Sequence, residues 1–138
     1  MNIYQVLQNS YLLLKNKSAT HKLDCEILLA NSLNLKNRLD LFLNLEKKLT
    51  KIQKNNFFQL IRERQNLKPI PKIITKKEFW NIEIDVSKKV LIPRPETEVL
   101  LDMVSKVYNN NSNIEFLDIG CGSGCIALSL LKIFINSK

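Results

Sequence analysis

All three glycines of this 138-residue chain fall within five residues, at Gly120, Gly122 and Gly124. Glycine is required where the backbone turns with a positive φ, or where a ligand approaches the main chain closely. The apolar run 114–119 before the loop predicts a strand, and the apolar run from about 124 to 135 predicts a helix. A strand, a glycine loop and a helix in this order open a doubly wound, Rossmann-like α/β sheet that binds a nucleotide-type ligand. The sequence therefore predicts an α/β fold for this part of the chain.

Three classes of ligand compete for such a loop. A phosphate loop continues into Gly-Lys-Ser/Thr, which is absent here, and a dinucleotide loop favours Gly or Ala at position 125, where this chain has Cys125. The acid Asp118 stands two residues before the first glycine, a spacing that resembles the first motif of S-adenosylmethionine methyltransferases. Dinucleotide binding and a turn without a ligand stay open as alternatives. The candidate cofactor-binding residues are Gly120, Cys121, Gly122, Ser123 and Gly124.

The first 67 residues favour helices. Three stretches carry apolar residues at helical spacing, and Ser18 or Thr20 can cap the second helix while Thr50 can cap the third. Leucines alternate over 39–45, which is also compatible with a strand. The predicted faces pack as a small helical bundle. They consist of Ile3, Leu7, Tyr11 and Leu14, then Leu23, Ile27 and Ala30, then Phe57, Leu60, Ile61 and Arg64.

The pattern changes at Pro69 and Pro71. Two prolines this close oppose a helix and favour an extended connector, so a domain boundary is expected here. Beyond it, apolar and polar residues alternate over 80–86, which predicts a half-buried strand. An earlier strand around 73–75 is expected to pair with it as a hairpin.

A second proline pair, Pro93 and Pro95, precedes another predicted helix. Pro95 suits a first helical turn, and Glu96 and Glu98 suit the positive end of that helix. The face expected to be buried consists of Val99, Leu100, Met103, Val104 and Val107.

The net charge of +8 usually indicates an anionic partner. Lysines outnumber arginines 17 to 4, however, and the chain also has 16 asparagines and 15 isoleucines. This skew is typical of A/T-rich codon usage, whereas phosphate recognition prefers arginine. We therefore expect a solvated basic surface, no direct nucleic-acid partner, and a basic adaptor for ribosomal or RNA partners only as an alternative.

The cysteines and the apolar runs exclude several other classes. Three cysteines are an odd number, which disfavours a disulfide framework and indicates a cytoplasmic protein. Cys121 and Cys125 cannot make a four-ligand zinc site, and the one histidine, His21, is distant in sequence, so no metal is expected. The longest apolar stretch, 125–135, is interrupted by Lys132 and is shorter than the roughly 20 residues of a membrane span.

Four segments together resemble one family. EFW at 78–80, LIPRPETE at 91–98 and DIGCGSG at 118–124 are similar to the release factor glutamine methyltransferases, and DCEILL at 24–29 resembles the helical domain of that family. The resemblance implies methylation of the side-chain amide of the glutamine in the Gly-Gly-Gln motif of class-1 peptide chain release factors. It implies S-adenosylmethionine as the cofactor, and it places LIPRPETE beside the cofactor pocket and the substrate entrance.

The same resemblance implies a domain organisation. It assigns 1–67 to a helical substrate-recognition domain, 68–89 to a connector with a β-hairpin, and 90–138 to the beginning of a Rossmann-like methyltransferase domain. The chain departs from the family at Lys68, where Glu is common, at Pro71, where a small residue is usual, and at Thr75, where glycine is usual nearby.

The family's Asn-Pro-Pro-Tyr motif, which grips the target amide, is absent from these 138 residues. No residue is therefore assigned as catalytic, and we expect the 138-residue chain alone to be inactive and to be a fragment. A dinucleotide-binding fragment remains the alternative enzyme class.

Overall fold

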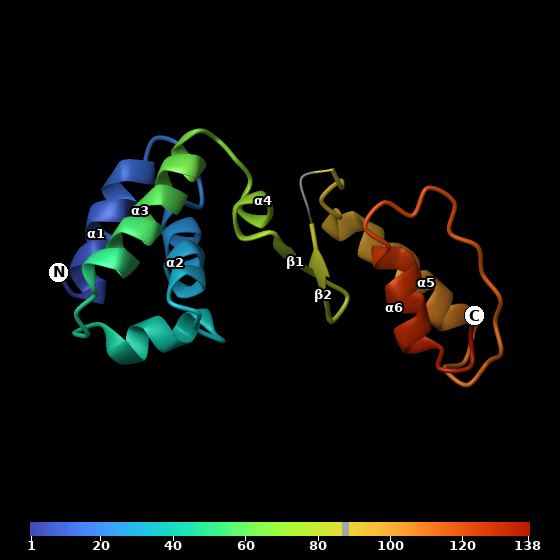
Figure 1. The fold of residues 1–138 in the computed structure, drawn as a ribbon. Helices are drawn as coiled ribbons and strands as arrows, with labels where there is room; N and C mark the ends of the chain where they lie inside the picture. The colour runs from blue at the N-terminus through green and yellow to red at the C-terminus, as the bar shows by residue number, and fades with distance from the viewer. Residues whose placement is uncertain (87–88) are drawn as a thin grey trace. The chain divides into compact units, whose positions relative to one another are not determined.

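The computed structural model describes residues 1–86 and 89–138. It divides into two compact units, Met1–Ile74 and Thr75–Lys138. Each unit has a hydrophobic core of its own, and Figure 1 shows the course of the chain through both.

The first unit is helical. Its elements are α1 (Ile3–Leu14), α2 (His21–Ser32), the 3₁₀ helix η1 (Arg38–Asn44), α3 (Lys51–Gln65) and the short α4 (Ile70–Ile74). The three long helices pack against one another (Figure 1). Their shared core is built mainly from Ile3, Val6, Leu7, Leu14, Cys25, Leu28, Leu29, Leu41, Phe57 and Ile61.

Local sequence explains where α1 and α3 begin. The side-chain oxygens of Asn2 and Thr50 each accept a hydrogen bond from the backbone N–H of the residue three positions later, which is Gln5 or Gln53. The side-chain oxygen of that glutamine accepts in turn from the backbone N–H of the capping residue. These capping boxes satisfy N–H groups that have no partner inside the helix. The predicted helices and the Thr50 cap are confirmed.

The predicted face of α2 is wrong for Leu23 and Ile27, although Ala30 is buried as predicted. Leu23 is 42% exposed and Ile27 is half-buried, whereas Asp24, Glu26 and Leu28 are buried. Two carboxylates occupy the inner side because each has a cationic partner, which is Arg64 for Asp24 and Arg38 for Glu26. Apolar periodicity alone could not place this helix.

Two further expectations about the first unit are corrected. Residues 39–45 do not form a strand, because η1 covers most of them and only Leu41 is buried. The extended connector is also wrong at Pro71, which lies inside α4. A proline in the first helical turn needs no acceptor, and the carbonyl of Pro69 accepts from the N–H groups of Lys72 and Ile73.

The second unit begins with a β-hairpin. β1 (Lys76–Phe79) pairs antiparallel with β2 (Ile82–Asp85), with Phe79 opposite Ile82. A hairpin forms as predicted, but the predicted first strand at 73–75 is wrong, because residues 73 and 74 belong to α4. Residues 80–81, predicted to begin the second strand, form the turn. The turn residues Trp80 and Asn81 both have positive φ, 43° and 58°. Such angles are typical of a two-residue turn that matches the twist of a hairpin.

Two helices complete the second unit. The 3₁₀ turn η2 (Pro95–Thr97) leads into α5 (Glu98–Val107), and α6 (Cys125–Ile133) follows the glycine loop. Pro95 is the first residue of η2, as predicted. The core of this unit consists of Phe79, Ile84, Val86, Leu101, Cys125, Leu130 and Phe134.

The predicted buried face of α5 is wrong for four of its five residues. Leu101 is fully buried, whereas Val99, Leu100, Met103 and Val107 are between 45% and 73% exposed. α5 packs against α6 and η2, and these contacts leave its apolar stripe uncovered. Of the predicted stripe, Val104 is half-buried and packs against the core of this unit, while the other four side chains are exposed.

The predicted strand at 114–119 is also wrong as a sheet element. Residues 114–119 form no strand, because a strand needs a partner for its backbone N–H and C=O groups. Among the described residues the only sheet is the two-stranded hairpin of β1 and β2. The predicted domain limits 1–67, 68–89 and 90–138 stay predictions, and residues 87–88 of the connector lie outside the described residues. No helix among the described residues is long and apolar enough to span a membrane.

Candidate functional site

The glycine loop has the backbone that its composition predicts. Gly120, Gly122 and Gly124 have φ values of 78°, 55° and 72°. L-residues with side chains rarely adopt this left-handed conformation, whereas glycine does so readily. Three such residues in five explain why all the glycines of the chain are gathered here.

The glycines are required for their φ angles and not for lack of room. A Cβ on Gly120 would meet no heavy atom within 4 Å, and one on Gly122 would lie 3.8 Å from the carbonyl oxygen of Gly120. A Cβ on Gly124 would lie 3.7 Å from Cδ1 of Leu128, which is ordinary van der Waals contact. The main chain of this loop is therefore open to the close approach of a ligand.

The loop leads directly into α6. The N–H of Gly124 donates to the carbonyl of Cys121 at 2.7 Å, and Gly124 then caps α6 without any side-chain hydrogen bond. The side chain of Cys121 is exposed, while that of Cys125 is buried in the core. The first turn of α6 thus presents its positive end beside the loop.

Asp118 adds an acid to this loop. Its Oδ2 atom is buried and has no hydrogen-bond partner among the described residues. An unpaired buried carboxylate oxygen costs about 1–3 kcal/mol or more, because it loses its water and gains no donor. Such an atom favours a cationic or hydrogen-bond-donating group of a ligand. Sequence reasoning used Asp118 to define the motif but left it out of the candidate residues, although its position before Gly120 was the available signal.

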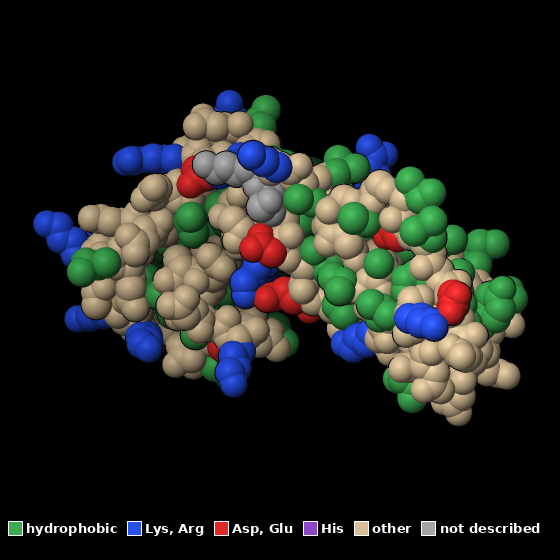
Figure 2. All heavy atoms as spheres, turned by 45° about the vertical axis from the view of Figure 1, so that its right-hand side comes forward, with side chains coloured by type: hydrophobic (Ala, Val, Ile, Leu, Met, Phe, Trp, Pro, Cys, Tyr) green, Lys and Arg blue, Asp and Glu red, His purple; other side chains and the backbone are tan. Residues whose placement is uncertain are grey.

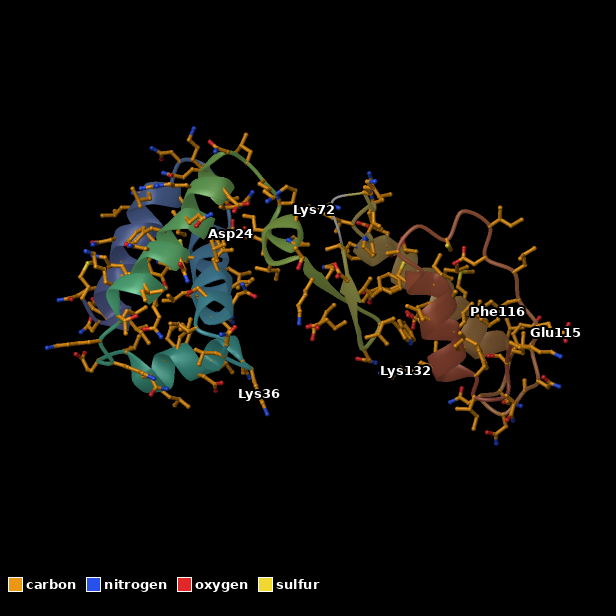
Figure 3. All side chains as sticks on the ribbon, viewed as in Figure 1. Asp24, Lys36, Lys72, Glu115, Phe116 and Lys132 are labelled. Carbon is orange, nitrogen blue, oxygen red and sulfur yellow. The ribbon has the colours of Figure 1, made fainter. Side chains whose placement is uncertain are left out.

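Residues 114–116, which precede the glycine loop, form backbone hydrogen bonds with Lys138. The N–H of Lys138 donates to the carbonyl of Ile114 at 3.1 Å, and the N–H of Phe116 donates to the carbonyl of Lys138 at 3.2 Å. The side chains of Lys138 and Glu115 also form an ion pair at 3.0 Å. Glu115 and Phe116 are labelled in Figure 3. Lys138 is thus bonded to both neighbours of Glu115, which is the hydrogen-bond pattern of parallel strands.

Apolar side chains around this segment are exposed on the second unit. Leu117 and Ile119 are 83% and 87% exposed, and Leu128 and Leu131 of α6 are 51% and 45% exposed. Hydrophobic side chains gather on the face shown in Figure 2. Ile114 and Phe116 pack against the core, so the run is apolar on both sides, as is typical of a strand inside a parallel sheet.

The two segments EFW and LIPRPETE meet at a second feature. An open hollow of about 510 Å³ is lined by Glu78, Trp80 and Asn81 of the hairpin and by Glu98 at the start of α5, among others. Nζ of Lys132 on α6 donates to the carbonyl of Asn81 at 2.7 Å, which ties the hairpin turn to the helix after the glycine loop. The hairpin, α5 and α6 therefore pack together within the second unit and share its core.

The strongest ionic contacts lie elsewhere, inside the first unit. Asp24 accepts from Ser18 Oγ at 2.7 Å, Thr20 Oγ1 at 2.9 Å and Arg64 Nε at 2.8 Å. Burial acts to raise the pKa of Asp24, but the hydrogen bonds from Ser18, Arg64 and Thr20 outweigh it and hold that pKa below its usual range. A carboxylate held by three donors is a structural anion and not an acid–base catalyst.

Two other groups of this unit are also structural. Burial, together with a hydrogen bond to Glu26, raises the pKa of Tyr11, and burial raises the pKa of the Cys25 thiol to about 11. Both side chains therefore stay protonated at neutral pH, and Cys25 is not a reactive thiolate. No group of three or more His, Cys, Asp or Glu that could hold a metal is found among residues 1–86 and 89–138.

Comparison with known proteins gives a consistent result. The family described as "PrmC N-terminal domain" matches residues 5–74. Proteins called release factor glutamine methyltransferase are 41% identical over 131 residues in Leptospira interrogans, covering 94% of this chain and 46% of the relative, and 39% identical over 128 residues in Shewanella oneidensis, covering 93% and 44%. The relative from Buchnera aphidicola subsp. Baizongia pistaciae is 40% identical over 138 residues, covering 100% of this chain and 50% of its own length. The chain thus spans about half the length of these curated relatives.

Proposed function

The chain belongs to the release factor glutamine methyltransferase family, whose N-terminal part it matches, and from that premise we propose that its second unit begins an S-adenosylmethionine-binding domain. The activity proposed for the whole protein is transfer of a methyl group to the side-chain amide of the glutamine in the Gly-Gly-Gln motif of class-1 release factors. The names of the relatives support both the methyltransferase class and the partner.

The observation that carries the cofactor proposal is the glycine loop with its unpaired acid. S-adenosylmethionine supplies an electrophilic methyl group on a sulfonium and carries an ammonium, a carboxylate and a ribose, but no phosphate. An open backbone at Gly120, Gly122 and Gly124 suits a ligand that lies against the main chain. Oδ2 of Asp118 needs a donor, which the ammonium of the ligand or a donor bound beside it would supply.

Cys121 and Ser123 complete the proposed cofactor loop at 120–124. The residues of this loop fit the cofactor by their open main chain and by the acid beside them, and the positive end of α6 suits a carboxylate. A dinucleotide is less well supported, because Cys125 occupies the position where Gly or Ala permits the closest packing of the helix.

The fold proposed for this domain is the beginning of a Rossmann-like sheet, with the region 90–138 as its first part. The parallel pairing of Lys138 with the segment 114–116 supports this, because parallel neighbours joined through a helix form the repeating unit of such sheets. The uncovered apolar faces of α5 and α6 support it as well, since a parallel sheet is packed on both sides.

The substrate entrance is proposed beside the hairpin. Glu78, Trp80 and Glu98 come from EFW and LIPRPETE, two segments that resemble the family, and all three line the open hollow. No residue of the chain is proposed as catalytic, because Asn-Pro-Pro-Tyr does not occur in it. Residues 1–138 alone are accordingly expected not to transfer a methyl group.

The test joins residues 1–138 to the remaining part of the Leptospira interrogans relative and supplies labelled S-adenosylmethionine with a class-1 release factor. The expected result is label on the glutamine of Gly-Gly-Gln and none on a release factor with alanine at that position. Residues 1–138 alone are the second control and should give no label. A folded chimera that binds S-adenosylmethionine but leaves the release factor unlabelled would contradict the proposed substrate.

A further inference from the structure

The charge of this protein is divided unequally between its two units. Unit Met1–Ile74 has 13 lysine and arginine residues against 5 aspartate and glutamate residues, whereas unit Thr75–Lys138 has 8 of each. The whole net charge of +8 therefore belongs to the helical unit. Two of its five acids, Asp24 and Glu26, pair with Arg64 and Arg38, so the excess of +8 is carried by the remaining 11 cationic and 3 acidic side chains of the unit.

One pocket lies within this basic unit. It has a volume of about 60 Å³ and an apolar lining that includes Leu33, Leu35 and Leu49, all of them half-buried. One enclosed water occupies roughly 10–15 Å³, so the pocket has room for about four water-sized groups, which is the size of a branched aliphatic side chain. The part of the lining made of Leu33, Leu35 and Leu49 disfavours a charged or strongly hydrated occupant.

The rim of the same pocket is polar and cationic. Asn44, Lys47 and Lys48 line it, and all three are exposed. The backbone around the rim is fixed, because Ile3 N donates to Lys47 O at 3.0 Å and Leu49 N donates to Met1 O at 3.2 Å. The two lysines therefore extend from a backbone segment that is anchored to the start of α1.

This end of the unit is far from the ionic contacts of Asp24. Asp24 lies in the first turn of α2, whereas Leu33 and Leu35 follow its last turn, and Figure 3 shows Asp24 and Lys36 at opposite ends of that helix. The pocket and its lysines thus form a surface separate from the ion pair of Asp24 with Arg64.

We propose that this docking surface, made of the pocket floor Leu33, Leu35 and Leu49 with the rim Asn44, Lys47 and Lys48, binds an acidic segment of the release factor. An aliphatic side chain of that segment fills the pocket, and carboxylates beside it meet Lys47 and Lys48. The proposal rests on the proposed function for the identity of the partner, and it adds the surface and the chemistry of recognition.

A protein partner is favoured over RNA by the kind of cations present. Of the three arginines in this unit, Arg38 and Arg64 are committed to buried acids, which leaves Arg62 and the lysines. RNA recognition relies on arginine forks and on stacked aromatic rings, whereas none of the residues that line the pocket is an arginine or an aromatic residue. A second copy of the chain is disfavoured because two surfaces of the same charge repel each other.

The experiment measures binding of the 138-residue chain to a class-1 release factor by interferometry, at about 50 and 200 mM salt. Lys47→Glu with Lys48→Glu should weaken binding about tenfold at low salt, chiefly through slower association. Lys15→Glu with Lys17→Glu is the matched control, because it makes the same charge change beyond the other end of α1, about 18 Å away for a helix of 12 residues. This control should retain nearly the original affinity.

A second pair of variants tests the pocket itself. Asn44→Phe puts a ring at the opening and should weaken binding at both salt concentrations, whereas Asn44→Ala removes the same hydrogen bond to the carbonyl of Asp40 and leaves the pocket open. Circular dichroism checks that each variant is folded. Equal losses from the two lysine pairs would show diffuse attraction and overturn the surface, as would unchanged binding by Asn44→Phe.

Two other outcomes also decide the question. Tighter binding of a single-stranded RNA, with the same dependence on Lys47 and Lys48, would overturn the choice of a protein partner. Absence of any binding to the release factor by the unmodified chain would overturn the docking surface. The proposed function is judged separately by methyl transfer in the chimera, so the two failures are distinguishable.

Discussion

Replacing Arg64 with methionine should destabilise the helical unit more than any exposed ion pair could. Nε of Arg64 donates to Asp24 at 2.8 Å, and its other nitrogens donate to Ser18 Oγ at 3.1 Å and to the carbonyl of Lys68 at 3.2 Å. The side chains of Arg64 and Asp24 are only 17% and 6% exposed. Arg64→Met therefore leaves a buried carboxylate without its counter-charge.

The size of the effect follows from this burial. Removal of one partner of a buried ion pair costs about 3–5 kcal/mol, and the lower end applies because Ser18 and Thr20 still donate to Asp24. For a unit of this size, about 3 kcal/mol lowers the midpoint of thermal unfolding by roughly 12–24 °C. Lys68→Met is the control in the same unit, because its pair with Glu63 is about one-third exposed and should contribute only about 0–1 kcal/mol.

The assay is urea unfolding followed by circular dichroism at 222 nm, with a double-mutant cycle. Asp24→Asn and Arg64→Met together should cost less than the sum of the two single changes, by about 2 kcal/mol, because the double variant no longer buries an unpaired charge. Equal effects of Arg64→Met and Lys68→Met would refute the reasoning, and so would simple additivity in the cycle.

Three further predictions concern other sites. Thr75 has a φ of 59°, so Thr75→Gly should stabilise the second unit by about 0.5–1 kcal/mol in urea unfolding, and a lower midpoint would contradict the strain. Ser129 Oγ is buried without a hydrogen-bond partner among the described residues, whereas Ser105 Oγ donates to Leu101 O at 2.8 Å. Ser129→Ala should therefore be about 1 kcal/mol more stable than Ser105→Ala. The pKa of Asp24 is lower in the folded state than in the unfolded state, so its contribution is present above about pH 4 and is lost as pH falls further. The stability of Asp24→Asn should therefore fall less steeply with acid, and parallel pH curves would contradict this assignment.

Sequence reasoning succeeds where the signal is local. Thr50 and the residues after it specify the start of α3 by side-chain capping, and three glycines in five residues specify the left-handed loop. Pro95 marks the beginning of η2. Each of these features depends on residues only a few positions apart, so the sequence contains all the information needed to place them.

The failures have a different cause. The inner face of α2 depends on Arg38 and Arg64, which stand 12 and 40 residues from their acids, so the helical period of apolar residues cannot reveal it. The apolar stripe of α5 and the run 114–119 show which residues favour burial, but burial also requires a partner. Within the described residues that partner is largely absent, and the side chains are exposed.

Some features of the candidate site are also predicted by local sequence, and others are not. The sequence identifies the loop 120–124 and the acid before it, whereas the open space above the glycines, the unpaired Oδ2 of Asp118 and the parallel pairing of Lys138 follow only from the structure. The loop as a cofactor site therefore rests on a local motif together with contacts that the motif alone does not specify.

The most direct test of the account is S-adenosylmethionine binding by Gly122→Asn, measured by calorimetry in the chimera with the Leptospira interrogans relative. Asparagine tolerates a positive φ better than other side-chain-bearing residues, and a Cβ at position 122 meets only the Gly120 carbonyl oxygen at 3.8 Å, so the fold should be retained. We expect a folded variant whose unfolding midpoint is slightly lowered by the positive φ at position 122, with loss of cofactor binding because the side chain occupies the space of the ligand. Undiminished binding of S-adenosylmethionine by this folded variant would contradict it and would leave the loop as a structural turn.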